Sequence, residues 1–118
     1  MSESQEQQAL IQWAEILSGQ YPELKLMYHI PNEGKRSPMT GARMKCEGLK
    51  KGVPDLCLPV ARKGYHGLYI EMKAKGGKVT TEQGEWLKAL GNQGYLTLVG
   101  WDWLATAEEI KKYLEIKK

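Results

Sequence analysis

The stretch GLYIEMK, residues 67–73, decides the fold that the sequence predicts. Successive side chains of a strand point to opposite faces, so one face of this stretch carries Glu71 and Lys73 together. The other face is apolar and consists of Leu68, Ile70 and Met72. A strand of this kind buries one face in a core and leaves a carboxylate and an amine side by side on the other.

A second predicted strand, residues 55–60, follows Gly52-Val-Pro54 and carries Asp55 on its polar face. Residues 62–66 have the right length for a hairpin between the two strands. If the hairpin closes tightly, the antiparallel register places Asp55 opposite Lys73 and Cys57 opposite Glu71. Three ionisable side chains then converge outside the core, beside two glycines that let another backbone approach closely, Gly52 and Gly76.

Two carboxylates held together repel each other unless a cation lies between them. Oxygen ligands with room for water suit Mg²⁺, for which Mn²⁺ can substitute. We therefore expect Asp55, Glu71 and a strand carbonyl, that of Met72, to hold the metal. A protonated Lys73 cannot bind the metal, but it can orient a water and neutralise charge that develops on a phosphate. These are the parts that phosphodiester hydrolysis requires, whereas Glu71 and Lys73 alone are also compatible with an ordinary surface ion pair.

Capping signals and hydrophobic spacing predict the remaining elements. They are a helix from Ser2 or Ser4 to about Ser18, a strand over 24–30, a short helix over 40–49, a helix from Thr80 through Leu90, a strand over 95–99, and a last helix capped by Thr106 with Glu109 as its partner. Gln83 lies three residues after Thr80, as a capping box requires. The order is typical of an α/β protein, and we expect residues 1–118 to form a single domain.

The charge pattern favours a polyanionic partner. The chain has a net charge of +3, but residues 25–52 carry seven basic side chains against two acidic ones, and residues 62–78 carry five against one. These basic segments bracket Asp55, where a polyanion would be held, although either segment alone is compatible with a solvated surface. We expect phosphate contacts from Lys35, Arg36, Arg43, Lys45, Lys50, Lys51 and Lys75.

Other features of the sequence exclude several classes of protein. No apolar run approaches the roughly 18 residues that a membrane span needs, and the start MSESQEQQ lacks the basic and apolar regions of a signal peptide. We expect a soluble, cytoplasmic protein. Cys46 and Cys57 match neither a zinc site nor a disulfide framework, so no small-molecule cofactor beyond the metal is expected.

Pro54-Asp55 followed by Glu71-Met72-Lys73 matches the PD-(D/E)xK nuclease signature. The flanking segments Gly52-Val-Pro-Asp-Leu56, His29-Ile-Pro-Asn32, Thr81-Glu-Gln83 with Trp86, and an opening Glu-Ser-Gln-x-Gln make the match more specific. Together they resemble a stand-alone virus-type replication-repair nuclease (VRR-NUC) domain of phages and bacteria, similar to the nuclease domain of the Fanconi-associated nuclease. This resemblance implies a restriction-endonuclease-like αβββαβ core with a mixed sheet flanked by helices.

The resemblance also implies roles for individual residues. Asp55 and Glu71 would bind the metal and Lys73 would be the catalytic lysine. Glu3 would be the acid of the first helix, reaching the metal indirectly, because Gln7 follows it by four residues. This sequence departs from the family pattern in having the polar Glu6 where an apolar residue is common, so Glu6 is the alternative. Either acid could instead be a first-turn acid that interacts with the helix dipole. Gln83 would contact the lysine or the scissile phosphate, or would serve only as a helix cap.

The implied activity is metal-dependent, structure-selective cleavage of DNA in a bacterium or a phage-infected cell. Symmetric cutting of a four-way (Holliday) junction needs two sites related by a two-fold axis, so we expect a homodimer acting on branched DNA. His29 and Asn32 could touch the DNA or support the basic loop, and Tyr65 could stack on an unpaired base or be an ordinary exposed tyrosine. The alternatives are a flap or nicking endonuclease and a catalytically silent DNA-binding module.

Overall fold

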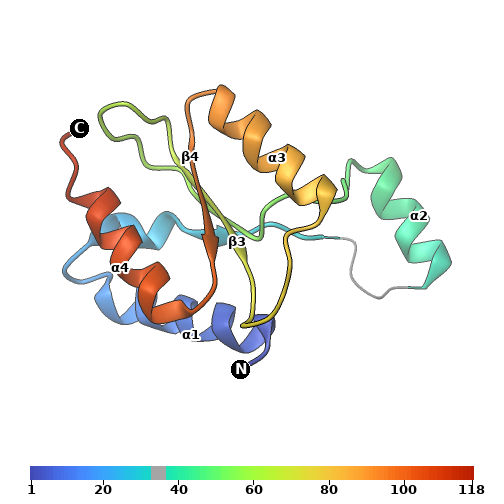
Figure 1. Cartoon of the computed structure of the whole chain (residues 1–118), viewed down its shortest axis with the longest axis horizontal. Helices are drawn as coiled ribbons and strands as arrows, with labels where there is room; N and C mark the ends of the chain where they lie inside the picture. The colour runs from blue at the N-terminus through green and yellow to red at the C-terminus, as the bar shows by residue number, and fades with distance from the viewer. Residues whose placement is uncertain (33–36) are drawn as a thin grey trace.

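A mixed sheet of four strands lies at the centre of the molecule (Figure 1). The structure is a computed structural model that describes residues 1–32 and 37–118. Its elements are α1 (Glu3–Leu17), the 3-10 helix η1 (Pro22–Leu26), β1 (Tyr28–His29), α2 (Pro38–Cys46), β2 (Leu56–Leu58), β3 (Leu68–Met72), α3 (Thr81–Asn92), β4 (Leu96–Gly100) and α4 (Trp103–Leu114). The strand order is β1-β2-β3-β4, with β4 parallel to β3 and the other neighbours antiparallel. The predicted α/β class is confirmed.

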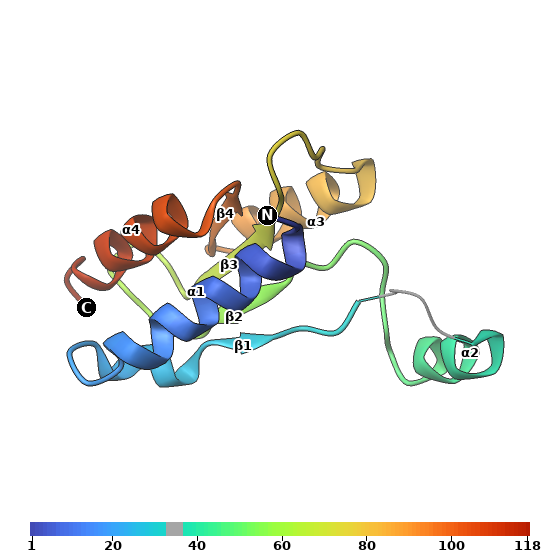
Figure 2. The same ribbon diagram turned by 90° about the horizontal axis from the view of Figure 1, so that it is seen from below.

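The hydrophobic core lies between the sheet and two helices, α1 and α4. Leu10 of α1 and Ile110 of α4 are fully buried together with Leu56, Leu68 and Ile70 of the sheet. Burying a side chain of this size contributes about 1.5–3 kcal/mol, so this layer supplies most of the favourable free energy of folding. Figure 2 shows α1 in front of the sheet and α3 behind it. None of the residues of α3 is fully buried, so the second face of the sheet is only partly covered.

The capping boxes of the first and third helices are confirmed. The Ser2 hydroxyl accepts a hydrogen bond from the N–H of Gln5, and the Gln5 side chain accepts one from the N–H of Ser2. Thr80 and Gln83 form the same reciprocal pair. Within the described ranges, no helix is both long and apolar enough to cross a membrane.

The pairing of β2 with β3 differs from the predicted register by two residues. Leu56 pairs with Ile70 and Cys57 with Tyr69, so Asp55 comes level with Glu71 and the predicted opposition of Asp55 to Lys73 is wrong. Because side chains alternate with a period of two, a shift of two residues leaves each of them on its predicted face.

The longer connection between these strands explains the shift. Pro59 has no N–H to donate, and β2 ends at the residue before it. The chain then makes a separate turn in which Arg62 and Tyr65 pair through their backbones, with Gly64 at a φ of 93°. The hairpin therefore does not close tightly between Ala61 and Gly67.

Two other expectations were wrong in part. The strand expected over 24–30 is limited to β1, because Pro22 begins the turn of 3-10 helix that occupies its first half. The last helix begins earlier than predicted, with Asp102 as its cap. The Asp102 carboxylate accepts from the N–H of Ala105, while the Thr106 hydroxyl is buried inside the helix and donates to the Asp102 carbonyl.

The helix α2 projects from the body of the molecule (Figures 1 and 2). It begins at Pro38 after the cap Ser37, two residues before the predicted start, and buries none of its residues. It carries Arg43 and Lys45 in its last turn. The packing of the core therefore does not depend on α2.

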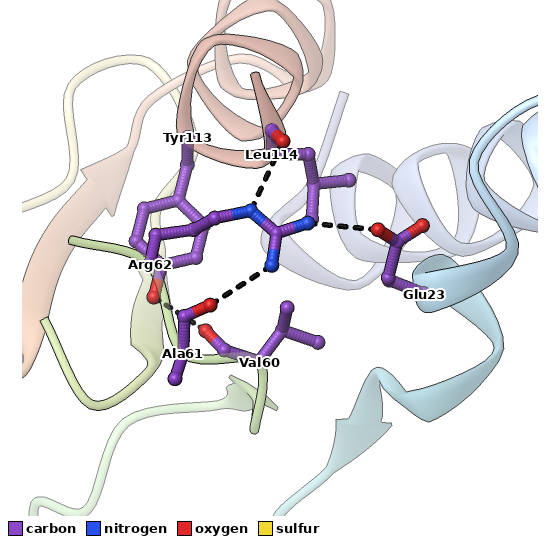
Figure 3. Close-up of polar contacts among 6 residues, drawn as sticks. All are labelled: Glu23, Val60, Ala61, Arg62, Tyr113 and Leu114. Carbon is purple, nitrogen blue, oxygen red and sulfur yellow. Dashed lines mark hydrogen bonds and ion pairs between the residues drawn. The ribbon is translucent and has the colours of Figure 1, made fainter. Parts of the chain in front are cut away.

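At the end of the sheet far from Asp55, Arg62 fastens the hairpin connection to α4. Its buried guanidinium donates to the carbonyls of Leu114 at 3.0 Å and Ala61 at 2.9 Å, and to the carboxylate of Glu23 at 2.8 Å (Figure 3). The Leu114 carbonyl lies in the last turn of α4, where carbonyls lack helical partners and the helix dipole favours a cation. One side chain thus satisfies acceptors from three segments.

Two neighbouring groups complete this contact. The Tyr113 hydroxyl donates to the carbonyl of Val60, which ties α4 to the residue just beyond β2 (Figure 3). A hydrogen bond from its own backbone, and then the Arg62 guanidinium, hold the pKa of Glu23 below its usual value. Glu23 is therefore ionised at neutral pH and balances the buried charge.

Replacing Arg62 with methionine should lower the free energy of unfolding by about 1–3 kcal/mol, because buried acceptors lose their donor while the apolar stem is kept. Urea denaturation measures this change. Lys63→Met is the matched control, since the Lys63 side chain is exposed, and it should leave the midpoint nearly unchanged. Equal midpoints for the two variants would contradict the anchoring role of Arg62.

Candidate active site

Asp55 joins three strands at the point where β2 begins. Its carboxylate accepts a hydrogen bond from the N–H of Met72 on β3 at 2.7 Å, in place of a backbone partner. Its backbone carbonyl accepts from the N–H of Ile30, just past β1, at 2.8 Å. The side chain is only 7% exposed. The carboxylate is therefore held rigidly beside the end of β3.

Glu71 is the most unusual side chain of this region. It is 2% exposed, and among the described residues its Oε1 is a buried oxygen without a hydrogen-bond partner. Burial, and then the neighbouring Asp55 carboxylate, raise the pKa of Glu71 to about 8 against a smaller opposing effect of Lys73. A buried oxygen without a partner costs stability, so the fold retains Glu71 in an unfavourable state.

A divalent cation would relieve both problems at once. It would give Oε1 a partner, and it would compensate the two adjacent carboxylates in place of a proton. In the described part of the chain no three His, Cys, Asp or Glu side chains are placed to hold a metal ion together. The donors available are two carboxylates and backbone oxygen, a set that suits Mg²⁺, which keeps several of its waters.

The Met72 carbonyl is well placed to join this donor set. In an extended strand the N–H and C=O of one residue point to the same side. The N–H of Met72 points to the Asp55 carboxylate, so its carbonyl faces the same side of β3. The next residue faces the other side, since the N–H of Lys73 donates to the carbonyl of Gly100, the last residue of β4.

Lys73 is buried beside Glu71. Its side chain is 6% exposed, and its Nζ lies 3.8 Å from Glu71 Oε2. At this distance the ammonium interacts with the carboxylate by charge more than by a hydrogen bond. The ammonium can therefore still orient a water or face a phosphate.

The structure places the two acids of the first helix in different environments. The Glu6 carboxylate is buried and accepts from the N–H of Trp103 at 2.9 Å, so it caps α4. Glu3 is exposed and lines a cleft of about 640 Å³ that has Asp55 in its wall. Its charge also raises the pKa of Glu71. The geometry therefore favours Glu3 as the helix-one acid.

Gln83 has the capping role that was its alternative. Its side-chain carbonyl accepts from the N–H of Thr80 at 2.9 Å. Only the NH₂ of the amide is then left to face a phosphate. Gly52, at a φ of 90°, brings the segment before β2 against the start of α3. A Cβ on Gly52 would lie 2.8 Å from the backbone carbon of Glu82.

His29 and Asn32 both support Asp55. His29 Nδ1 lies 3.0 Å from the Asp55 carbonyl and 3.1 Å from the amide nitrogen of Gln7, and the imidazole tautomer decides which contact is a hydrogen bond. The Asn32 amide donates to Asp55 Oδ1 at 3.5 Å. Both side chains are exposed and line the cleft with Glu3, so they can also reach a bound substrate.

The predicted phosphate contacts are spread around the site. Lys35 and Arg36 lie outside the described residues. Arg43 and Lys45 are on α2, Lys50 and Lys51 lie on the return to β2, and Lys75 is exposed in the turn after β3. Lys51 also forms an exposed ion pair with Glu82 at 3.5 Å, of the kind that contributes little to stability.

Sequence reasoning missed a polar row along α1 in the same cleft. Ser4, Gln8 and Gln12 line it together with Glu3, and Gln8 donates to the Ser4 hydroxyl at 3.0 Å. Their spacing of four residues was the available signal, because it places them on one side of a helix. Hydrophobic periodicity draws attention to the opposite side.

Comparisons with known proteins identify the family of this chain. The model of the VRR-NUC domain matches residues 1–99. The chain belongs to the VRR-NUC family. A solved structure described as a "VRR_NUC domain protein" is similar, with a TM-score of 0.79 and 26% sequence identity over 100% of this chain and 93% of that chain. A search of curated proteins found no match. The predicted family is confirmed, and the VRR-NUC domain has a nuclease-type fold.

The raised pKa of Glu71 predicts a pH dependence of stability in the chelator-treated protein. The folded state keeps a proton up to about pH 8 that the unfolded state releases near pH 4.5, so stability falls as pH rises between these values. The slope should approach about 1.4 kcal/mol per pH unit at most. Denaturation series on the wild type and Glu71→Gln would measure it, and the variant should lose this dependence. Parallel curves for the two proteins would contradict the buried, protonated state.

Exchanging each acid of α1 for alanine should separate their roles. Glu6→Ala should lower the free energy of unfolding by about 1 kcal/mol, because the N–H of Trp103 in the first turn of α4 loses its acceptor. Glu3→Ala should leave stability nearly unchanged and reduce the nuclease activity proposed below by about 10- to 100-fold, as loss of an indirect metal contact does. Thermal denaturation and cleavage rates measure the two effects. The reverse assignment would follow if Glu3→Ala destabilised the protein and Glu6→Ala only slowed cleavage.

Proposed function

We propose that this protein is a Mg²⁺-dependent endodeoxyribonuclease that cuts branched DNA. The observation that carries the proposal is Glu71, a buried carboxylate with an oxygen that lacks a partner, lying beside Asp55 and Lys73. A structural ion pair would not require a second buried carboxylate. Membership of the VRR-NUC family supports the same reaction class.

In this proposal Asp55, Glu71 and the Met72 carbonyl would hold the ion, with Glu3 acting through water. The bound metal would polarise the phosphodiester and lower the pKa of water. Mn²⁺ should replace Mg²⁺, because it accepts the same oxygen ligands.

The other side chains would position the substrate and balance its charge. The Lys73 ammonium can orient the attacking water and stabilise the negative charge that grows on the phosphate, and its buried position strengthens this effect. The free NH₂ of Gln83 would contact a phosphate oxygen. Asn32 and His29 would keep Asp55 in place. The surrounding lysines and arginines would bind the DNA backbone without reading its sequence.

We further propose that two copies of the chain cut a four-way junction symmetrically as a homodimer. Each copy has one set of Asp55, Glu71 and Lys73, so paired cuts on opposite strands need two copies related by a two-fold axis. The reaction would take place in the cytoplasm of a bacterium or of a phage-infected cell. Single cuts in flaps or nicked DNA would indicate a monomeric flap or nicking endonuclease.

Purified protein with MgCl₂ should make paired cuts in a synthetic four-way junction, and EDTA should stop the reaction. Asp55→Asn and Lys73→Ala should reduce cleavage by about 100-fold or more, because the first removes a negatively charged metal ligand and the second removes the positive charge beside the reacting phosphate. Lys117→Ala, which removes an exposed lysine of the carboxy-terminal end, is the matched control and should cut at the wild-type rate.

Binding and stoichiometry are measured separately. Both inactive variants should still bind the junction, with an affinity that falls steeply as salt rises. Light scattering of the protein alone should give the mass of two chains. Failure of the wild type to cut any DNA structure, or full activity of Lys73→Ala, would leave a DNA-binding module without the proposed mechanism.

A further inference from the structure

A second pocket lies between α2 and α3 and shares none of its described lining residues with the cleft along α1. Its volume is about 400 Å³. Side chains from α2, from α3 and from the segment that leads into β2 contribute to its lining. The apolar part of the wall consists of Ile30, Pro31, Met44, Leu49, Val53 and Trp86. Neither the metal site nor the predicted phosphate contacts account for an apolar hollow here.

Trp86 is the fixed aromatic side of this pocket. Its indole N–H donates to the carbonyl of Lys51 at 3.0 Å, so the orientation of the ring is set by the chain that forms the opposite rim. The residue is only half-buried. A partly exposed tryptophan held by its N–H offers its ring to a flat ligand.

The charges around the pocket favour an anionic ligand. Lys50 and Glu47 belong to its lining. The basic Arg43 and Lys51 are the chain neighbours of the lining residues Met44 and Lys50, and the acidic Glu82 lies one helical turn before Trp86. Glu47 is partly compensated by Arg43, whose Nε lies 3.9 Å from it, and Glu82 by Lys51. A flat apolar group attached to a negatively charged chain fits both properties, and this is the chemistry of a nucleotide in single-stranded form.

The position of the pocket relates it directly to the candidate active site. Val53 in its wall is two residues before Asp55, and Ile30 in its wall donates its N–H to the Asp55 carbonyl at 2.8 Å. Two extended residues span about 6.6 Å. The rise of a DNA strand is about 3.4 Å per nucleotide. A base in the pocket would therefore be about two nucleotides from a phosphate at Asp55.

We propose that this pocket binds a single unpaired nucleobase, extruded from the DNA close to the phosphate that is cut. The proposal rests on the nuclease function proposed above and specifies its substrate. Bases at a branch, a gap or a mismatch are extruded at lower cost than paired ones, and an aromatic pocket captures them by stacking. The chain would thus select branched DNA by a base that the branch leaves unpaired.

Fluorescence of 2-aminopurine tests the proposal without requiring cleavage. The analogue is placed in turn at each of the first three nucleotides on either side of the branch of a four-way junction that carries one unpaired nucleotide. The junction is bound to the Asp55→Asn variant, which is expected not to cut. At one of these positions the fluorescence should be quenched by stacking on the Trp86 ring. The double variant that combines Asp55→Asn with Trp86→Leu should restore the fluorescence. Affinity for this junction should also fall by about fivefold or more, whereas affinity for a fully paired duplex should change little.

Two further variants keep the result interpretable. Tyr65→Leu removes an exposed aromatic ring from the hairpin connection, at the opposite end of β2 and β3 from Asp55, and should leave the quenching intact. Met44→Lys changes the pocket wall from α2, which buries none of its residues, so it should fold normally. It should lose the quenching while binding paired DNA at least as tightly, because it adds a positive charge.

The outcomes separate this proposal from the nuclease function. In one outcome the wild type cuts junctions, while the 2-aminopurine signal of the Asp55→Asn complex is the same with and without Trp86→Leu or Met44→Lys. This result would overturn the base pocket and leave the proposed nuclease function intact. Quenching that depends on Trp86, in a protein that cuts no DNA, would support the pocket and remove the nuclease. Loss of the signal in Tyr65→Leu, with no effect of Trp86→Leu, would place the base at the other end of the sheet and also overturn the proposal.

Discussion

The hydrogen bonds of Asp55 are the constraint on which the rest of this structure depends. Its carboxylate takes the place of a strand partner for the N–H of Met72, and its backbone carbonyl takes the N–H of Ile30. The three strands thus stay connected at the point where β2 begins, while the carboxylate itself is held next to Glu71. Asp55 is held through both its side chain and its backbone, so it cannot move away from Glu71. The repulsion between the two carboxylates is therefore built into the fold.

Contacts elsewhere in the fold offset the unfavourable free energy of burying these two carboxylates together. Glu71 loses solvation and keeps an oxygen without a partner, while the apolar layer of Leu10, Ile70 and Ile110 holds the sheet against α1 and α4. At the other end of β2 and β3, Arg62 binds acceptors from three segments. Among the described residues, the buried side-chain oxygen without a partner lies at the end of the sheet opposite to Arg62. Unsatisfied buried groups of this kind concentrate at functional sites, because only a fold stabilised elsewhere can keep them.

The resemblance to VRR-NUC domains was recognisable from short segments of sequence, and so was the chemistry of the candidate site. The alternation in GLYIEMK identified Glu71 and Lys73 as neighbours, and the preceding Pro-Asp supplied the second carboxylate. The helix caps at Ser2 and Thr80 were equally readable, because a hydroxyl and a glutamine three residues apart bond to each other's backbone. These are local properties, and tertiary packing did not change them.

The errors occurred where distant parts of the chain compete. The β2–β3 register moved because Pro59 ends one strand and Arg62 is drawn to α4, a contact across 52 residues of sequence. Thr106 was a plausible cap, but Asp102 already occupied that place and its carbonyl takes the Thr106 hydroxyl. Glu3 and Glu6 were indistinguishable in the sequence, and only the N–H of Trp103 assigned Glu6 to α4. The sequence by itself determined which side chains face away from the core, since a strand alternates with a period of two whatever it packs against. Tertiary structure alone decided that Asp55 rather than Cys57 stands level with Glu71, which acid of α1 remains open to the cleft and where an apolar pocket forms near Asp55, because each depends on contacts between segments that local periodicity does not relate.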